Sequence, residues 1–322
     1  MADIRRIGIL TSGGDAPGMN AAIRAIVRTA ASQNVPCLGI YRGYNGLINS
    51  DVVEMDARSV DGIQVRGGTI LYTARCDEFR TPEGVKRAAD TCRYLGIQGL
   101  VVIGGDGTFR GALDISRAGV PTIGIPATID NDIQCTNYTI GFDTAANTAV
   151  EAIDKLRDTM QSHERCSVVE VMGNRSGNLA MYVGIAVGAS SILIPERPTD
   201  PEEIFEKIRM GRIRGRHHHI IVMAEGVGQA HELAAAVREQ TGIETRVTTL
   251  GHIQRGGSPS PRDRVTATRM GCHAVDALLE GKSNRVVCYR NTEITDMDIE
   301  EALALPKNFH EDMYFTASRI AN

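Results

Sequence analysis

VPTIGIPATIDND, from Val120 to Asp132, is the stretch that decides the fold. Its apolar first half predicts a buried strand that ends at a proline, and two carboxylates, Asp130 and Asp132, follow in the next loop. In open α/β sheets, ligands bind at this carboxyl edge of the strands. Two carboxylates so close together call for a metal, a basic side chain or a shared proton. Because Asp and Asn are also common in turns, these residues alone leave a site and a plain turn both open.

The composition indicates a globular protein of two domains. The chain has 322 residues, which suits two domains of about 150 residues each. A hydrophobic share of 42% is enough for real cores. Aromatic residues make up only 4% and tryptophan is absent, which argues against stacking platforms for single-stranded nucleic acid. The 35 basic and 39 acidic residues nearly balance, so no basic field attracts nucleic acid or a membrane surface.

The cysteines and the apolar runs predict a cytoplasmic protein. The 7 cysteines are scattered without a CxxC pair, which is typical of free thiols in a reducing compartment. The first residues, MADIRR, lack the apolar core of a signal peptide. No apolar run approaches the roughly 20 residues that a membrane span needs.

Two glycine-rich loops each separate a predicted strand from a predicted helix. TSGGDAPGMN, residues 11–20, lies between a strand at 6–10 and a helix at 21–32. GGDGT, residues 104–108, lies between a strand at 100–103 and a helix at 109–117. Such loops aim backbone N–H groups at phosphate, and Asp106 could hold Mg²⁺. The first loop is neither a Walker A motif nor a GxGxxG fingerprint, so a glycine turn without a ligand also stays open.

Strands and helices alternate along the rest of the chain. Further strands are predicted at 37–41, 166–172, 191–195, 219–224, 245–250 and 285–289, and the residues beyond are predicted to be a helical tail. This alternation predicts an α/β fold: two Rossmann-like domains with mostly parallel sheets flanked by helices. The two glycine-rich loops and the Asp130/Asp132 loop all follow strands of this kind, so we expect them to meet at one sheet edge.

Five motifs together resemble the bacterial ATP-dependent 6-phosphofructokinase family. They are the loops at 11–20 and 104–108, Thr128-Ile129-Asp130-Asn131-Asp132, Val171-Met172-Gly173 and Gly251-His252-Ile253-Gln254-Arg255-Gly256-Gly257, in the family's order. The resemblance runs nearly end to end and implies the phosphofructokinase fold, with an ATP-binding domain at 1–140 plus 253–303. It places a fructose 6-phosphate-binding domain at 141–252 plus 304–322. The implied reaction transfers a phosphoryl group from ATP to the 1-hydroxyl of D-fructose 6-phosphate with Mg²⁺, a step of glycolysis.

The resemblance also implies roles for single residues. Asp130 is the general base, with Thr128, Asp132 and Arg75 as catalytic neighbours, and Asp106 takes the position of the Mg²⁺ ligand. The ATP-binding positions are Gly14, Arg75, Cys76, Gly105, Asp106, Gly107 and Thr108. The fructose 6-phosphate positions are Thr128, Asp130, Arg165, Met172, Gly173, Asn174, Glu225, Arg246, His252 and Arg255. Arg165 and Arg246 look like the pair that reaches in from a neighbouring subunit, which implies a homo-oligomer, usually a tetramer.

Gly107 and Ala127 bear on the phosphoryl donor. Pyrophosphate-dependent relatives carry Asp and Lys at these two positions, and a carboxylate at 107 would repel the nucleotide's α-phosphate. Their absence favours ATP over the alternative, a pyrophosphate-dependent phosphofructokinase or another sugar-phosphate kinase. A catalytically idle regulatory subunit would lack the base or the metal ligand, whereas Asp106, Asp130 and Arg75 are all present.

A basic group resembles the family's effector site. Its members are Arg24, Arg28, Arg157, Arg214 and Arg216, and in the family such a site binds ADP and phosphoenolpyruvate between subunits. Two positions depart from the family pattern, because Ala57 stands in place of an arginine and Ser190 in place of a glutamate. In the sugar motif, Asn174 stands in place of an arginine.

Overall fold

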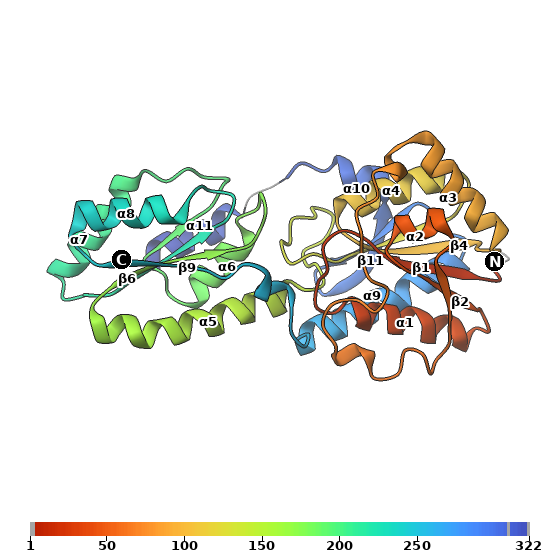
Figure 1. Ribbon diagram of the computed structural model, residues 1–322, viewed down its shortest axis with the longest axis horizontal. Helices are drawn as coiled ribbons and strands as arrows, with labels where there is room; N and C mark the ends of the chain where they lie inside the picture. Colours follow the sequence, from red (N-terminus) through yellow and green to blue (C-terminus); the bar gives the residue numbers. More distant parts are fainter. Residues whose placement is uncertain (1–3, 308–309, 321–322) are drawn as a thin grey trace. The chain divides into compact units, whose positions relative to one another are not determined.

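The computed structural model describes residues 4–307 and 310–320. They form two compact units, and the chain passes from one unit to the other more than once (Figure 1). Unit 1 contains residues 4–128, 133–144 and 255–307, and unit 2 contains residues 129–132, 145–254 and 310–320. Four residues of the deciding stretch, Ile129–Asp132, therefore pack with unit 2, although the strand before them belongs to unit 1.

Unit 1 is built on a seven-stranded sheet of order β11-β10-β5-β4-β1-β2-β3. The strands are β1 (Ile7–Thr11), β2 (Cys37–Ile40), β3 (Val52–Met55), β4 (Gly99–Gly104), β5 (Thr122–Pro126), β10 (Arg285–Arg290) and β11 (Glu293–Asp298). All pairs from β10 to β2 are parallel, and only the edge strands β11 and β3 are antiparallel. The central strands are buried along their whole length, which explains their nearly continuous apolar sequences.

Helices cover both faces of this sheet. They are α1 (Met19–Ser32), α2 (Tyr44–Asn49), α3 (Pro82–Tyr94), α4 (Asp106–Arg117), α9 (Pro261–Leu279) and α10 (Ile299–Ala304), with short 3₁₀ turns at Ile63–Val65 and Glu78–Arg80. On one face α1 packs against α9, where Gly271 lets the two backbones approach closely. On the other, α2, α3, α4 and α10 share an apolar core that includes Tyr44, Phe79 and Phe109 (Figure 1).

The buried carboxylate of Asp263 holds residues 133–144, which follow Asp132, in place. Asp263, in α9, is fully buried and accepts hydrogen bonds from the N–H of Gly141 at 2.7 Å and of Thr144 at 2.9 Å. The hydroxyls of Tyr138 and Thr144 also donate to it. A buried charge with this many partners avoids the cost of an unpaired one. Residues 133–144 are thereby tied to the core of unit 1.

Unit 2 has a smaller sheet that is parallel throughout. Its order is β7-β8-β6-β9, with β6 (Cys166–Val171), β7 (Ser191–Leu193), β8 (His219–Ala224) and β9 (Thr245–Thr249). Its helices are α5 (Phe142–His163, which begins in unit 1), α6 (Asn178–Ala186), α7 (Pro201–Ile213), α8 (Ala230–Thr241) and α11 (Glu311–Ile320). Ile204, Phe205 and Val237 place α7 and α8 against one face of the sheet.

The predicted α/β fold with mostly parallel, helix-flanked sheets is confirmed, with two local corrections. The stretch after residue 290 is not simply a helical tail, because β11 pairs with β10 before α10 begins. GGDGT is not wholly a loop, because α4 starts at Asp106 after its N-cap, Gly105. An aspartate in the first turn is favourable there, since its charge complements the helix dipole.

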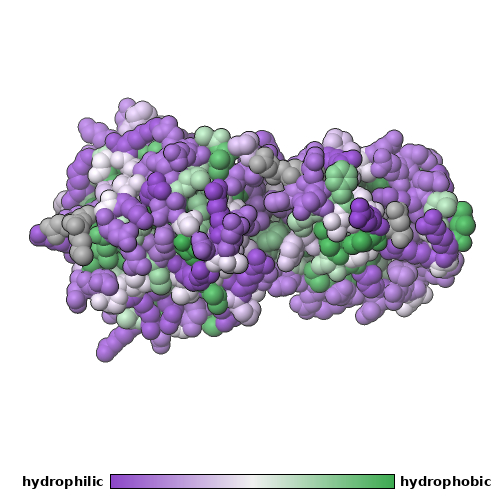
Figure 2. Space-filling view, turned by 180° about the vertical axis from the view of Figure 1, so that it is seen from behind, coloured by the Kyte–Doolittle hydropathy of each residue, from purple (hydrophilic) through white to green (hydrophobic). Residues whose placement is uncertain are grey.

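The surface is mostly polar where the structure describes it. Figure 2 shows hydrophobic side chains as small patches among hydrophilic ones on the face that it draws. Exposed large hydrophobic residues such as Tyr94 and Ile213 are scattered. No helix of the described residues is both long and apolar enough to cross a membrane.

Candidate functional site

The three predicted site loops follow three adjacent strands. Because β5, β4 and β1 are neighbours and parallel, their carboxyl ends lie at one edge of the sheet, as the sequence predicts. Thr108 Oγ1 donates a hydrogen bond to the carbonyl of Ser12 at 3.1 Å, which joins the two glycine-rich loops. The N–H of Ala127 donates to the carbonyl of Gly104 at 3.0 Å, which joins the second loop to the start of the third.

The first glycine-rich loop lies against an arginine. Arg255 Nη1 donates to the carbonyl of Asp15 at 3.4 Å, and a Cβ added to Gly14 would lie 2.0 Å from that same nitrogen. Thr73 Oγ1 holds the loop from the other side by donating to the carbonyl of Gly13 at 2.6 Å. The structure thus brings Arg255 to the loop with Gly14, whereas the resemblance assigns Arg255 to the sugar phosphate.

The three glycines of the second loop have different structural surroundings. A Cβ on Gly104 would lie 2.3 Å from the carbonyl oxygen of Ser12, so the packing there excludes any side chain. A Cβ on Gly105 or Gly107 would meet no atom within 4 Å, and neither residue needs a positive φ. The fold therefore does not explain these two glycines, which leave open space at the N-terminus of α4.

Asp106 begins α4 at this opening, and unit 1 carries further charged groups among the predicted site residues. Asp106 is paired with Lys307, whose Nζ lies 3.9 Å from Oδ2, and its side chain is 29% exposed. Arg75 is exposed and makes no hydrogen bond or ion pair with the described residues, and Cys76 beside it is half-buried. The N-terminus of α4, Arg75 and Arg255 together offer unit 1 several positive groups for an anion.

Asp130 lies in a short segment that is hydrogen-bonded to other residues of unit 2. Its side chain is buried, with 8% exposed, and its carbonyl accepts from Ser176 Oγ at 3.4 Å. The next carbonyl, that of Asn131, accepts from Asn178 Nδ2 at 2.7 Å. Asp132 belongs to the same segment and is half-buried. Thr128 is on the unit 1 side, where Thr139 Oγ1 donates to its carbonyl at 2.6 Å.

Four of the ten predicted sugar-binding residues, Met172, Gly173, Asn174 and Glu225, lie at the carboxyl ends of β6 and β8. Met172 and Gly173 follow β6, and the N–H of Met172 donates to Gln254 Oε1 at 3.4 Å. Glu225 follows β8 and accepts from the N–H of Asn174 at 2.7 Å. His252 is exposed on the 3₁₀ turn Gly251–Arg255. Among these, Asn174 has a left-handed φ of 55°, a conformation that asparagine tolerates better than most residues.

The structure does not place the other two predicted sugar-phosphate residues with this group. Arg165 directly precedes β6, so it lies at the opposite end of the strand from Met172. Arg246 lies in β9, next to β6. Both arginines bind Glu244, which the sequence did not single out: Arg165 Nε is 2.7 Å from Oε2, and Arg246 Nη2 is 2.6 Å from Oε1.

Part of the predicted effector group lines a cavity in unit 2. The cavity has a volume of about 550 Å³ and is bordered by Ser190, Arg214, Arg216 and the buried His219. Arg157 donates to the carbonyl of Val187. Burial, and then the charge of Arg157, lower the pKa of Arg216. Arg24 and Arg28 lie on α1 in unit 1, where Arg28 pairs with Asp61 at 3.2 Å.

Sequence reasoning missed His219 as a part of this cavity. Its Nδ1 lies 3.2 Å from Ser190 Oγ, and its side chain is only 2% exposed. Burial is the largest cause that lowers the pKa of His219 to about 4, and Arg216 adds to the effect. The sequence shows only three consecutive histidines, whereas the buried one is identified by its position as the first residue of β8.

The chain resembles known proteins over almost its full length. The family model described as Phosphofructokinase matches residues 6–278. An ATP-dependent 6-phosphofructokinase of Clostridium botulinum (strain Loch Maree / Type A3) is 56% identical over 315 residues, 98% of this chain and 99% of that one. One of Clostridium novyi (strain NT) is 55% identical over 97% of this chain and 98% of that one.

A solved structure agrees with the sequence relatives. The phosphofructokinase from Saccharomyces cerevisiae superposes with a TM-score of 0.89 at 34% identity. The match covers 98% of this chain but 48% of the yeast chain, so this chain spans about half the length of that relative. These matches confirm the resemblance that the five motifs predict. The chain belongs to the phosphofructokinase family.

Proposed function

We propose that the protein is an ATP-dependent 6-phosphofructokinase. It transfers the γ-phosphoryl group of ATP to the 1-hydroxyl of D-fructose 6-phosphate, and the products are fructose 1,6-bisphosphate and ADP. The observation that carries this proposal is that three polar loops follow β5, β4 and β1, which are adjacent parallel strands of unit 1. Curated relatives of nearly equal length and 56% identity that carry this name support it.

Each unit takes one substrate in this proposal. The ATP-binding domain, 1–140 plus 253–303, corresponds largely to unit 1, and the fructose 6-phosphate-binding domain, 141–252 plus 304–322, corresponds largely to unit 2; they differ at Ile129–Asp132, which pack with unit 2, and at short segments near the other limits. Phosphoryl transfer depends on positioning and on neutralising charge, and the two units supply different parts of that work. We further infer a cytoplasmic enzyme of glycolysis, which agrees with seven cysteines that are all free thiols.

The nucleotide lies along the two glycine-rich loops. Gly105 and Gly107 leave the N-terminus of α4 bare, so backbone N–H groups reach the phosphates without a side chain between them. Gly14, Cys76 and Thr108 complete the ATP contacts, and the unpaired guanidinium of Arg75 stabilises the charge that develops during transfer. Position 107 carries no carboxylate and position 127 carries no lysine, and this supports ATP over pyrophosphate as the donor.

Asp106 fits a magnesium ion. Its carboxylate is a hard oxygen ligand, it is partly exposed, and it follows β4 directly beside the open space at Gly105 and Gly107. Such a site suits Mg²⁺, which keeps several waters and takes one or two carboxylates. When bound, the ion neutralises phosphate charge. Lys307 provides a positive partner for the same carboxylate in the protein itself.

Asp130 is the base that accepts the proton of the 1-hydroxyl. Its segment is held by Ser176 and Asn178, so the carboxylate does not have to be ordered at the moment of reaction. As the hydroxyl oxygen bonds to the γ-phosphorus, the bond from that phosphorus to the β-phosphate oxygen breaks and ADP leaves. Thr128 and Asp132 flank the base and orient the sugar.

The sugar phosphate is bound by residues of two protomers. Met172, Gly173, Asn174, Glu225, His252 and Arg255 act from the protomer that carries the base. Arg165 and Arg246 lie at the far end of β6 and in β9, which supports a role in a neighbouring protomer's site and hence a homo-oligomer; the family resemblance favours a tetramer. Guanidinium groups suit the phosphate dianion because their forks match its oxygens.

The cavity beside Ser190 is proposed to bind an effector anion. Arg214 and Arg216 line it, and Arg24, Arg28 and Arg157 are the other predicted members of the site. ADP and phosphoenolpyruvate are the candidate effectors. Ser190 offers no carboxylate for an effector-bound metal, but its hydroxyl and the buried His219 remain as polar groups.

A donor assay tests the proposed function. The rate of fructose 1,6-bisphosphate formation is measured with ATP or with pyrophosphate as the sole donor, each with and without ADP and phosphoenolpyruvate. We expect activity with ATP and Mg²⁺ and none above background with pyrophosphate. Turnover with pyrophosphate alone would overturn the donor, and no turnover with either would overturn the proposed reaction.

A further inference from the structure

Glu244 joins Arg165 and Arg246 through one carboxylate. Oε2 accepts from Arg165 Nε at 2.7 Å, and Oε1 lies 2.6 Å from Arg246 Nη2. The backbone sets this arrangement, because β6 and β9 are parallel neighbours in which Cys166 is in register with Thr245. Arg165 and Glu244 therefore stand side by side at the amino ends of the two strands. Arg246 is two residues beyond Glu244 and shares its side of the strand.

The carboxylate holds both arginines by one edge and leaves the rest of each guanidinium available. The Nη atoms of Arg165, and Nε and Nη1 of Arg246, make no hydrogen bond or ion pair with the described residues. The side chains of Arg165 and Arg246 are 27% and 68% exposed. The free N–H groups thus remain open to a ligand from outside, in the geometry that suits phosphate oxygens.

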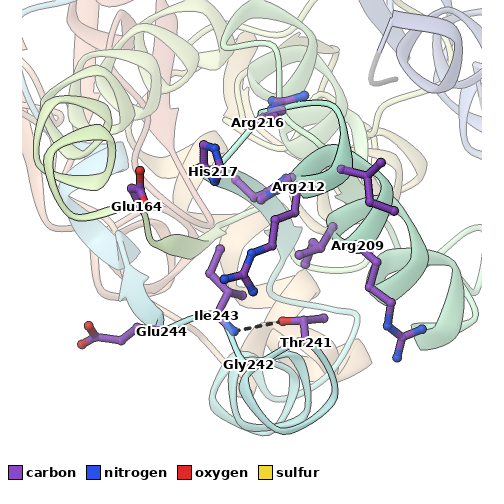
Figure 3. Close-up of a pocket in the computed structure, with 12 residues that line it drawn as sticks. Glu164, Arg209, Arg212, Arg216, His217, Thr241, Gly242, Ile243 and Glu244 are labelled. Atoms are coloured by element: carbon purple, nitrogen blue, oxygen red, sulfur yellow. Dashed lines mark hydrogen bonds between the residues drawn. The ribbon is translucent and has the colours of Figure 1, made fainter.

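The carboxyl group of Glu244 is ionised at neutral pH and interacts with both arginines. The hydrogen bond from Arg165 is the largest cause that lowers the pKa of its carboxyl, and Arg246 adds to the effect. Glu244 also borders a cavity of about 470 Å³ with Arg212 and Ile243. Figure 3 shows its side chain extending away from both of them. The negative charge between two guanidinium groups reduces their mutual repulsion, so they can stay close together before any phosphate arrives.

We propose that Glu244 is a positioning residue for the sugar phosphate: it orders Arg165 and Arg246 as a preformed fork. This inference rests on the proposed role of the two arginines. A half-exposed ion pair contributes little to folding, so the effect of Glu244 is on affinity for the phosphate rather than on stability. A preordered fork lowers the entropy cost of binding, because fewer rotamers are lost when the ligand arrives.

Steady-state kinetics of Glu244→Ala and Glu244→Gln test the inference. We expect Glu244→Ala to raise the KM for fructose 6-phosphate by about tenfold, the scale of a charged hydrogen bond. Turnover at saturation and the KM for ATP stay within about twofold of the wild type, because both concern groups in other parts of the protein. Glu244→Gln keeps one acceptor oxygen and gives an intermediate KM. The control is Glu202→Ala, which breaks the exposed pair with Arg209 and leaves every constant unchanged.

Variants of Arg165 and Arg246 distinguish the proposed phosphate-binding role of the arginines from the positioning role of Glu244. If Arg165→Ala and Arg246→Ala leave the KM for fructose 6-phosphate unchanged, the proposed role of the arginines is wrong. If these variants raise it but Glu244→Ala leaves it unchanged or lowers it, only the positioning role is overturned. In the double-arginine background, Glu244→Ala should add nothing further. Thermal unfolding and native mass of each variant show that folding and assembly are intact.

Discussion

The hydroxyl of Thr108 donates a hydrogen bond to the main-chain carbonyl of Ser12, at 3.1 Å, inside the first unit. This bond ties the two glycine-rich loops together, and Tyr44 Oη adds a second support by donating to the carbonyl of Thr108 at 2.6 Å. The two loops, which we propose to hold one polyphosphate, are thereby fixed relative to each other. Preorganisation of this kind contributes to affinity in addition to the ATP contact proposed for Thr108.

Thr108→Val is expected to weaken ATP binding. Valine keeps the shape but leaves the Ser12 carbonyl without this donor, which costs about 1 kcal/mol and raises the KM for ATP by about fivefold. Initial rates at varied ATP and saturating sugar phosphate measure this. Thr122→Val is the matched control, because Thr122 Oγ1 also donates to a buried carbonyl, that of Ala112, at 3.1 Å. An equal rise in both variants would mean that general stability, not the joined loops, sets the KM.

Gly107→Asp is expected to reduce the use of ATP strongly without unfolding the protein. A side chain at this position has open space, so the fold is preserved, but a carboxylate there repels the nucleotide phosphates. We expect kcat/KM for ATP to fall about a hundredfold or more, a loss of a few kcal/mol. Gly107→Ala adds bulk without charge and should retain most of the activity.

Gly104→Ala provides the opposite control. Its Cβ would clash with the Ser12 carbonyl at 2.3 Å, so here the free energy of unfolding should fall by about 1–3 kcal/mol. Chemical denaturation of the three glycine variants separates packing from charge. The hypothesis about the donor fails if Gly107→Asp retains wild-type kcat/KM for ATP.

The contrast between these glycines shows where sequence reasoning stops. GGDGT predicts a phosphate loop, but the letters alone do not reveal that Gly104 is required by packing while Gly105 and Gly107 are not. The parallel strands were predictable because buried strands such as Leu100–Ile103 are apolar throughout. Strand β11 could not be predicted in the same way, because its sequence, EITDMD, is largely polar. It forms a strand because it pairs with β10.

The candidate site was predictable to a similar extent. Asp106, Asp130 and Met172 follow strands directly, so local sequence places each of them at a sheet edge. Glu244 was missed because its meaning depends on the strand order β8-β6-β9, which brings Arg165 within reach across 79 residues of sequence. A contact between residues so far apart in the chain leaves no recognisable pattern in the sequence around either residue. The roles of the site residues remain predictions that the variants described here test.

Asp130→Ser is expected to remove the base and leave the nucleotide site intact. Turnover should fall by about a thousandfold, within the range that general base catalysis contributes, while the KM for ATP changes less than about twofold. Asp154→Asn, on the exposed side of α5, removes a carboxylate elsewhere and should have no effect. Single-turnover rates with both substrates measure the chemical step. Near-normal turnover of Asp130→Ser would show that another group takes the proton.

His219 is expected to make the stability of the protein depend on pH. Burial, and then the nearby Arg216, lower its pKa in the folded protein to about 4, below the usual histidine pKa of 6.5. Its stabilising contribution is therefore complete above pH 6.5 and is lost as the pH falls toward 4, by about 2–3 kcal/mol in total.

Urea unfolding at a fixed protein concentration from pH 7.5 to 4.5 measures this for the wild type and His219→Gln. The profile of the variant should be flatter by that amount, whereas His231→Gln, at an exposed position of α8, should follow the wild type. Parallel profiles for all three proteins would mean that other groups cause the acid sensitivity.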